Sequence, residues 1–273
     1  MNTKRNPQAA QMADESMVRN LAAQASAIWP QEQPLFARYA IRDEAHIADI
    51  GCGSGEITAR LAALYPRAEI VGVDILEGPV AYARKRYAQL APRVRFEQGD
   101  AFELPLPTDS FDLVTCRHVT QAIPEPERAL NELKRICRSG GWLHVLSEDY
   151  GMLHMPVGKL DTDRLWHRGA IPFATAVGGA DARVGRRTYS LLKHLGLVDI
   201  RVDYVIVDSL RVPRDTFASI IEAWRDGYTN VIGDSTALGR NETRALFDEA
   251  VAGIRNPEDY AVWHVPIVSG RKP

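Results

Sequence analysis

The chain has 273 residues and a net charge of −2, with 33 Lys and Arg against 35 Asp and Glu. Its composition, 45% hydrophobic and 25% charged, is that of a globular protein, and its charge disfavours nucleic acid as a partner. No run approaches the roughly 20 apolar residues of a membrane helix, and the N-terminus lacks the apolar core of a signal peptide. We therefore expect a cytoplasmic protein, monomeric or homodimeric, that binds neither membranes nor nucleic acid.

The first forty residues predict one or two helices, which Pro30 and Pro34 are expected to interrupt. A short apolar run ending at Ile50 predicts a buried strand, and an amphipathic helix is expected from Glu56. Strands and helices then alternate, which favours a mainly parallel sheet with helices on both faces. Further strands are expected at 69–73, 94–97, 111–116 and 142–147, and helices at 79–90 and 126–137, the latter capped at 139–141.

The pattern loosens at residues 150–183, which carry Gly, Pro and scattered aromatic residues. A segment of this length without a regular pattern indicates a functional insertion or lid. Beyond it we expect a helix at 184–195, a strand at 198–207, helices at 214–228 and 239–254, and a last strand at 260–268. The expected organisation is a helical cover, 1–40, and an α/β domain, 41–273, with insertions at about 150–183 and 208–259.

Three glycines at alternate positions, Gly51, Gly53 and Gly55, connect the strand that ends at Ile50 to the following helix. Glycine accepts positive φ and lets a ligand approach the backbone closely, so this turn is a predicted binding site. Asp74 ends the next strand, where dinucleotide-binding folds place the acidic side chain that accepts the ribose hydroxyls. The spacing G-x-G-x-G nevertheless differs from the dinucleotide fingerprint G-x-G-x-x-G.

The motifs DIGCGSG, VGVD, GDAFELP, FDLV and ELKRICRSGGWLHV follow one another along the chain. In this order they resemble the successive motifs of class I S-adenosylmethionine-dependent methyltransferases, over roughly residues 45–150. They look most like small-molecule methyltransferases related to quinone-biosynthesis enzymes. The resemblance implies an α/β fold, a Rossmann-like doubly wound seven-stranded sheet whose last strand is antiparallel. The long helical link at 208–259 departs from the family, in which a short hairpin often stands there.

The resemblance also implies that the chain binds S-adenosyl-L-methionine and releases S-adenosyl-L-homocysteine. Asp49 would fix the glycine turn, and Asp74 would accept both ribose hydroxyls. The residues implied at the cofactor are Asp49, Gly51, Cys52, Gly53 and Gly55 at the turn, Asp74 at the ribose, Ile75, Asp100 and Ala101 at the adenine, and Arg117 and His118 at the methionine end.

His118 follows the fourth strand closely and is the candidate general base, which the reaction needs only if the acceptor carries a proton. Two interpretations stay open: a catalytic base, or a histidine that only packs or hydrogen-bonds at the end of the strand. Glu148 and Tyr150 follow the fifth strand at the same edge, where ligands gather in open α/β sheets. The candidate substrate contacts are Trp29, Glu148, Tyr150, His154 and Trp166.

After the fourth strand the chain reads RHVTQAIPEP, without the Asn/Asp-Pro-Pro-aromatic motif of family members that methylate adenine or glutamine amides. We therefore expect a small-molecule acceptor, methylated on N, O or C. The histidines show no metal-ligand spacing, and the three cysteines form no C-x-x-C pair, so no metal is expected. Two alternatives remain: a non-catalytic S-adenosylmethionine-binding regulator or partner protein, and a nicotinamide-dependent oxidoreductase, which the glycine spacing disfavours.

Overall fold

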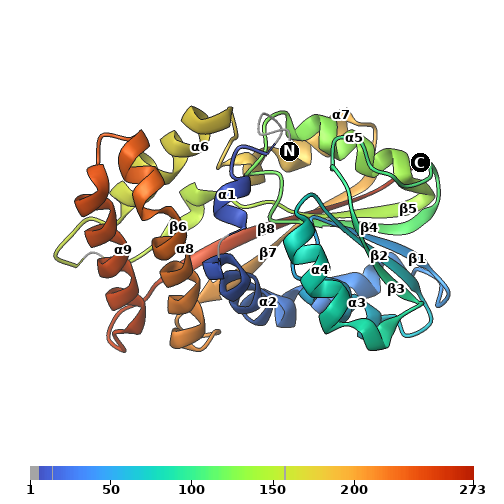
Figure 1. The fold of residues 1–273 in the computed structure, drawn as a ribbon, viewed down its shortest axis with the longest axis horizontal. Coiled ribbons are helices and arrows are strands. Elements are labelled where there is room, and N and C mark those ends of the chain that lie inside the picture. Colours follow the sequence, from blue (N-terminus) through green and yellow to red (C-terminus); the bar gives the residue numbers. More distant parts are fainter. Residues whose placement is uncertain (1–5, 14, 157) are drawn as a thin grey trace.

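The computed structural model of the chain describes residues 6–13, 15–156 and 158–273. One sheet runs through these residues in the order β3-β2-β1-β4-β5-β8, and β7 pairs with the other side of β8 (Figure 1). Its strands are β1 (His46–Ile50), β2 (Glu69–Asp74), β3 (Val94–Gln98), β4 (Phe111–Arg117), β5 (Cys137–Leu146), β6 (Leu153–His154), β7 (Val198–Asp208) and β8 (Val262–Arg271).

Strands β1 to β5 are parallel, whereas β8 runs antiparallel to both β5 and β7. The seven-stranded sheet with an antiparallel last strand is therefore confirmed. The short strand β6 is an addition to it, paired with the beginning of β8. Because β1 lies between β2 and β4, the strand order reverses at β1, and such a reversal leaves a crevice at the carboxyl ends of the strands.

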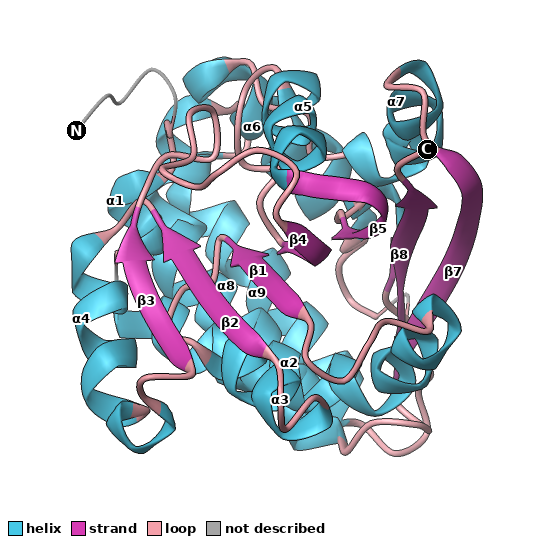
Figure 2. Ribbon diagram, turned by 90° about the vertical axis from the view of Figure 1, so that its right-hand side faces the viewer, coloured by secondary structure: helices cyan, strands magenta, loops and turns pink. Residues whose placement is uncertain are grey.

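Helices cover both faces of the sheet. Figure 2 shows α5 and α7 on one side, and α2 and α3 on the other. Apolar side chains alternate along β1, so that Ile47 packs toward α2 and α3 whereas Ala48 packs toward α5 and α7. The helices are α1 (Ala9–Met12), α2 (Glu15–Phe36), α3 (Glu56–Leu64), α4 (Glu77–Arg86), α5 (Pro126–Ile136), α6 (Ile171–Gly178), α7 (Thr188–His194), α8 (Arg214–Ser235) and α9 (Gly239–Arg255).

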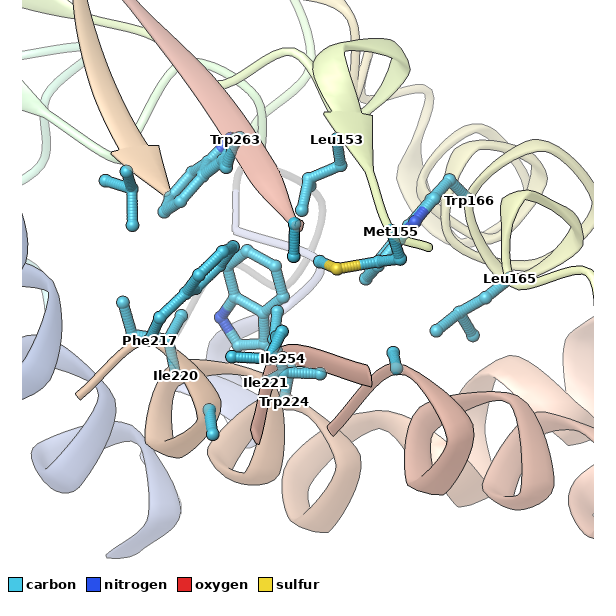
Figure 3. Packing of buried hydrophobic residues seen from close by; sticks show 14 of the residues in the cluster. Leu153, Met155, Leu165, Trp166, Phe217, Ile220, Ile221, Trp224, Ile254 and Trp263 are labelled. Carbon is cyan, nitrogen blue, oxygen red and sulfur yellow. The ribbon is translucent and has the colours of Figure 1, made fainter. Parts of the chain in front are cut away.

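The helices α6, α8 and α9 group together at one end of the molecule, beyond the sheet (Figure 1). They share a hydrophobic core with β8 and with the segment after β6. Figure 3 shows Phe217 and Trp224 of α8 pointing toward Trp263 of β8, with Met155 and Trp166 nearby. The segment 150–183 is thus more regular than predicted, because it contains a π-helical stretch, Leu165–Ala170, that leads directly into α6.

The N-terminal prolines do not interrupt their helix, contrary to the prediction. Pro30 and Pro34 both lie inside α2, which continues to Phe36. Each proline removes one backbone hydrogen bond from the helix, at a cost of about 3 kcal/mol. Burial of Ile28 and Trp29 against the rest of the protein favours the continuous helix nonetheless. Tertiary packing therefore overrides the local helix-breaking signal.

The Ser-Gly-Gly sequence at 139–141 does not cap α5, contrary to the prediction. The helix ends at Ile136, and β5 begins at the next residue. Gly140 has a φ of 78° within β5, and its N–H donates to the carbonyl of Lys272 at 2.8 Å. The positive φ of Gly140 therefore belongs to an irregular start of β5, beside the C-terminal residues. The same glycine pattern is typical of a helix cap, which explains the wrong prediction.

Candidate functional site

The turn between β1 and α3 brings its backbone to the carboxyl edge of the sheet. Gly51, Gly53 and Gly55 have φ values of 75°, 51° and 82°. A Cβ atom on Gly51 would lie 2.2 Å from Cγ2 of Val119, which leaves no room for a larger residue unless that side chain moves. A Cβ atom on Gly55 would instead lie 2.8 Å from Cε1 of Phe96. The structure therefore places Gly55 in the packing of α3 against β3.

Asp49 anchors this turn from beneath. The hydroxyl of Thr58 donates to its Oδ2 at 2.6 Å, and the hydroxyl of Thr115 donates to its Oδ1 at 2.9 Å. These hydrogen bonds connect β1 to the start of α3 and to β4. Burial raises the pKa of the Asp49 carboxyl, and the two hydroxyl groups oppose that rise. Burial also raises the pKa of the Cys52 thiol well above its usual range.

A cavity of about 830 Å³, here called the turn cavity, opens where β1, β2, β3 and β4 end. Most residues predicted to hold a cofactor line it, whereas Asp49 and Cys52 line a smaller adjoining cavity and Gly55 lines neither. The predicted residues on the wall of the turn cavity are Gly51, Gly53, Asp74, Ile75, Asp100, Ala101, Arg117 and His118.

Asp74, at the end of β2, presents a partly buried carboxylate to the turn cavity. The N–H of Gly53 donates to its Oδ2 and the N–H of Leu76 donates to its Oδ1, both at 2.9 Å. Burial raises the pKa of this carboxyl, and the backbone hydrogen bonds oppose the rise. A carboxylate has about four lone-pair sites, so both oxygens keep acceptor capacity for a ligand's hydroxyl groups.

A second cavity, of about 690 Å³, lies between the sheet edge, α1, α2 and the helices α6, α8 and α9. We call it the aromatic cavity after Tyr150, Trp166, Phe173, Trp224, Tyr228 and Phe247, which line it. Glu148, Tyr150 and Trp166 were predicted substrate contacts and stand on its wall. Trp29 and His154 are not brought there: Trp29 is buried against Phe36, and His154 is exposed on β6.

His118 stands at the junction of the two cavities and lines both. Its φ of 57° is uncommon for a residue other than glycine, and such conformations concentrate at functional sites. Its Nδ1 lies 2.5 Å from Oε1 of Glu148. Because a carboxylate only accepts hydrogen bonds, Nδ1 is the donor in this pair. Nε2 is buried and has no hydrogen-bond partner among the residues described.

Sequence reading did not identify the polar residues that α2 adds to this pair. Nε2 of Gln24 donates to Oε1 of Glu148 at 3.2 Å, and Asn20, one helical turn earlier, lines the same cavity. Both side chains are only 2% exposed. Two amides four residues apart on the buried face of α2 were the signal that was missed, because buried polar groups require partners.

Arg117 is held by a buried network that reaches back to α2. Its Nε donates to Oε1 of Glu32 at 2.8 Å, and Nε2 of His144 lies 2.9 Å from the same oxygen. The hydroxyl of Tyr39 lies 2.6 Å from Nδ1 of His144. Burial opposes ionisation of Glu32, but the charge of Arg117 and the hydrogen bond with His144 outweigh it and lower the pKa from 4.5 to about 2. The buried Nη2 of Arg117 has no partner in the described part of the chain.

Among residues 6–13, 15–156 and 158–273, no group of three or more His, Cys, Asp or Glu side chains is arranged to hold a metal ion. None of the helices described is both long and apolar enough to span a membrane.

The chain is similar to proteins that are named as methyltransferases. A model of the methyltransferase domain family matches residues 48–145. The trans-aconitate 2-methyltransferase of Deinococcus radiodurans is 35% identical over 162 residues, which cover 58% of this chain and 60% of that protein. The enzyme of the same name from Variovorax paradoxus is 32% identical over 209 residues, covering 76% of this chain and 70% of that protein. A demethylmenaquinone methyltransferase from Thermus thermophilus is 37% identical over 100 residues, covering 37% and 46%. The matched region thus spans 60% of the length of the Deinococcus protein and 46% of the Thermus protein.

Solved structures with the same fold include enzymes of different chemistry. Phosphoethanolamine N-methyltransferase 2 of Haemonchus contortus, solved with phosphomonomethylethanolamine and S-adenosylhomocysteine, matches with a TM-score of 0.63 at 16% identity, covering 100% of this chain and 61% of that chain. The [4+2]-cyclase SpnF matches with a TM-score of 0.55 at 21% identity, covering 89% and 81%. At these identities the likeness shows the fold alone, and a fold does not determine the reaction.

Proposed function

The chain belongs to the class I S-adenosylmethionine-dependent methyltransferases, and on this premise we propose that it transfers the methyl group to a small-molecule acceptor. One observation carries the proposal. The unpartnered Nε2 of His118 lies where the turn cavity, with its glycines and Asp74, meets the aromatic cavity. A methyl group held in the first cavity would face an acceptor in the second at this histidine.

The residues of the turn cavity fit S-adenosylmethionine. Asp74 has lone pairs for the ribose hydroxyls, and Gly51 and Gly53 line the same cavity without side chains of their own. The buried Nη2 of Arg117 is an unpartnered charged donor on the same wall, which suits the methionine carboxylate. We also propose that Ile75, Asp100 and Ala101 contact the adenine.

When bound, S-adenosylmethionine supplies a methyl group on a positively charged sulfur, a good leaving group. The chain then has to position the acceptor, exclude water and move a proton. Nε2 of His118 would take the proton from the acceptor. Glu148 would hold the ring through Nδ1 and stabilise the imidazolium that results, as the carboxylate does in other base–carboxylate pairs. Gln24 would in turn hold Glu148.

Replacing Asp74 by alanine is expected to weaken binding of S-adenosylhomocysteine by about 1.5–3 kcal/mol, which is tenfold or more. The variant loses charge-assisted hydrogen bonds to the ribose and leaves the N–H groups of Gly53 and Leu76 without their acceptor. Calorimetric titration measures the change. Glu77→Ala, a carboxylate on the surface of α4 that pairs with Arg84, is the matched control and should bind like the wild type. Equal affinity in both variants would refute the assignment of Asp74.

We further propose that residues 1–40 and 150–183 form a mobile cover over the acceptor site in the aromatic cavity, although residues 1–5, 14 and 157 of these segments lie outside the described residues. Met12 and Leu21 border both cavities, and Tyr150, Trp166 and Phe173 line the aromatic one. Closure of such a cover excludes water from the methyl group.

Hydrogen exchange is expected to slow in both segments when S-adenosylhomocysteine and an acceptor are bound together, because closure removes their amides from water. Mass spectrometry of peptic fragments measures the protection. Helix α5 lies on the other face of the sheet and serves as the internal control. The cover is disproved if protection increases in neither segment while both ligands are bound.

A further inference from the structure

The described wall of the aromatic cavity carries a carboxylate but no side chain of Lys or Arg. The carboxylate is that of Glu148. Glu148 is 2% exposed, its Oε1 accepts from Gln24 and pairs with His118, and its Oε2 has no partner in the described ranges. A buried carboxylate without a fixed cation is costly, so a positively charged ligand would be stabilised beside it.

Most of the other unpartnered polar atoms on the described part of the wall are hydrogen-bond acceptors, whereas Nε1 of Trp166 is an unpartnered donor. Gln24 uses its N–H group on Glu148, so the atom it leaves unpartnered is the acceptor Oε1. Oε1 of Gln121 is likewise buried and unpartnered within the described residues. These oxygens, together with Oε2 of Glu148, can accept hydrogen bonds from a ligand rich in N–H donors.

Six aromatic rings line the cavity together with aliphatic side chains and methionines. The ring planes of Trp166 and Trp224 are 80° apart with centroids at 6.1 Å, and Tyr150 lies 5.4 Å from Trp224. Figure 3 shows the two tryptophans arriving from different elements, Trp224 from α8 and Trp166 from the segment after β6. Ring faces carry partial negative charge and attract ammonium groups, most strongly when water is excluded.

The two tyrosines of the aromatic cavity, Tyr150 and Tyr228, add no charge to it. Burial, followed by the negative charge of Glu148, raises the pKa of the Tyr150 and Tyr228 phenols. Both phenols therefore stay neutral over the physiological range, and the cavity holds a carboxylate amid uncharged aromatic groups.

We propose that the methyl acceptor is an amine that enters the aromatic cavity as its ammonium ion, with Glu148 as the counter-charge and specificity determinant. This inference rests on the proposed function. A second positive charge beside the donor's sulfonium needs a compensating carboxylate, and Glu148 supplies it.

The transfer balances as follows. The ammonium gives one N–H proton to Nε2 of His118, and the freed lone pair forms the new nitrogen–carbon bond. The carbon–sulfur bond breaks, and its electron pair stays on sulfur, which becomes the neutral thioether of S-adenosylhomocysteine. The product is a methylated ammonium ion, and the proton on His118 passes to water.

Three molecules of nearly one shape test the charge preference without any catalysis. They are choline, its neutral isostere 3,3-dimethylbutan-1-ol, and the anion 3,3-dimethylbutanoate. Each is titrated calorimetrically into the wild-type protein saturated with S-adenosylhomocysteine. We expect choline to bind at least about tenfold more tightly than the alcohol, and the anion to bind most weakly. A preference for the anion, or no preference, overturns the inference.

Glu148→Gln tests the residue, because it removes the charge and nearly preserves the shape. The variant should bind choline and the alcohol about equally, while its affinity for S-adenosylhomocysteine stays within about twofold of the wild type. Should the variant keep the preference for choline, Glu148 is not its source and the assignment falls. Failure of S-adenosylhomocysteine to bind the wild type would refute the proposed function itself, whereas cofactor binding with a preferred anion refutes only the amine.

Discussion

Replacing His118 by alanine is expected to lower kcat by about 10²- to 10⁴-fold while the Kd of S-adenosylhomocysteine changes little. The imidazole touches the junction of the cavities, and its loss removes the group that takes the acceptor's proton. Single-turnover kinetics and calorimetry together separate the two effects.

His194→Ala is the control for this experiment, because His194 is exposed on α7 and lines neither cavity. It should leave both kcat and cofactor affinity unchanged. A loss of cofactor binding in the His118 variant, with the turnover of bound cofactor intact, would contradict the base assignment and make His118 part of the cofactor's own site.

Replacing Glu32 by glutamine is expected to lower the free energy of unfolding by about 3–5 kcal/mol, because the charge of Arg117 is left buried without its partner. Denaturant unfolding measures the loss. Adding Arg117→Met to the same chain removes the unpaired charge and should restore part of the stability. Glu127→Gln, at an exposed position of α5, is the control and should change stability by less than about 0.5 kcal/mol.

The effect of Glu32 should depend on pH in one direction. Its pKa is about 2 in the folded protein, below the ordinary value of 4.5. A lowered pKa contributes stability above the unfolded value, and that contribution disappears as the pH falls through the folded value. The difference between wild type and Glu32→Gln should therefore be full above about pH 5 and shrink between about pH 4.5 and 2. A difference that stays constant over this range would show that Glu32 is not ionised in the folded protein.

The parts of the fold that the sequence predicted well are those specified by local patterns. A short stretch of chain contains the strand ending at Ile50, the glycine turn and Asp74, so local sequence patterns predict their arrangement. The errors occurred where contacts with residues distant in sequence determine the secondary structure. Pro30 and Pro34 stay helical because α2 is buried against other elements, and Gly140 serves a strand because it pairs with Lys272, at the end of the chain.

The candidate site follows the same division. Most of the residues predicted at the cofactor line the turn cavity, since motif order places them at neighbouring strand ends, whereas Asp49, Cys52 and Gly55 do not line it. The polar pairs of the junction could not be predicted, because their partners are far apart in sequence: 30 positions separate His118 from Glu148, 85 separate Arg117 from Glu32, and 124 separate Gln24 from Glu148. Whether such residues meet depends on how the helices beyond the sheet pack.

The most direct test of the proposed methyl transfer is to measure turnover with acceptors from several chemical classes. The wild-type protein is incubated with S-adenosylmethionine and with amines, phenols and carboxylates in separate reactions. Mass spectrometry then quantifies S-adenosylhomocysteine and each methylated product. We predict many turnovers with an amine, with one methylated product formed for each S-adenosylhomocysteine. Tight binding of S-adenosylmethionine without methylation of any acceptor class would contradict the transferase and indicate a protein that binds the cofactor without using it.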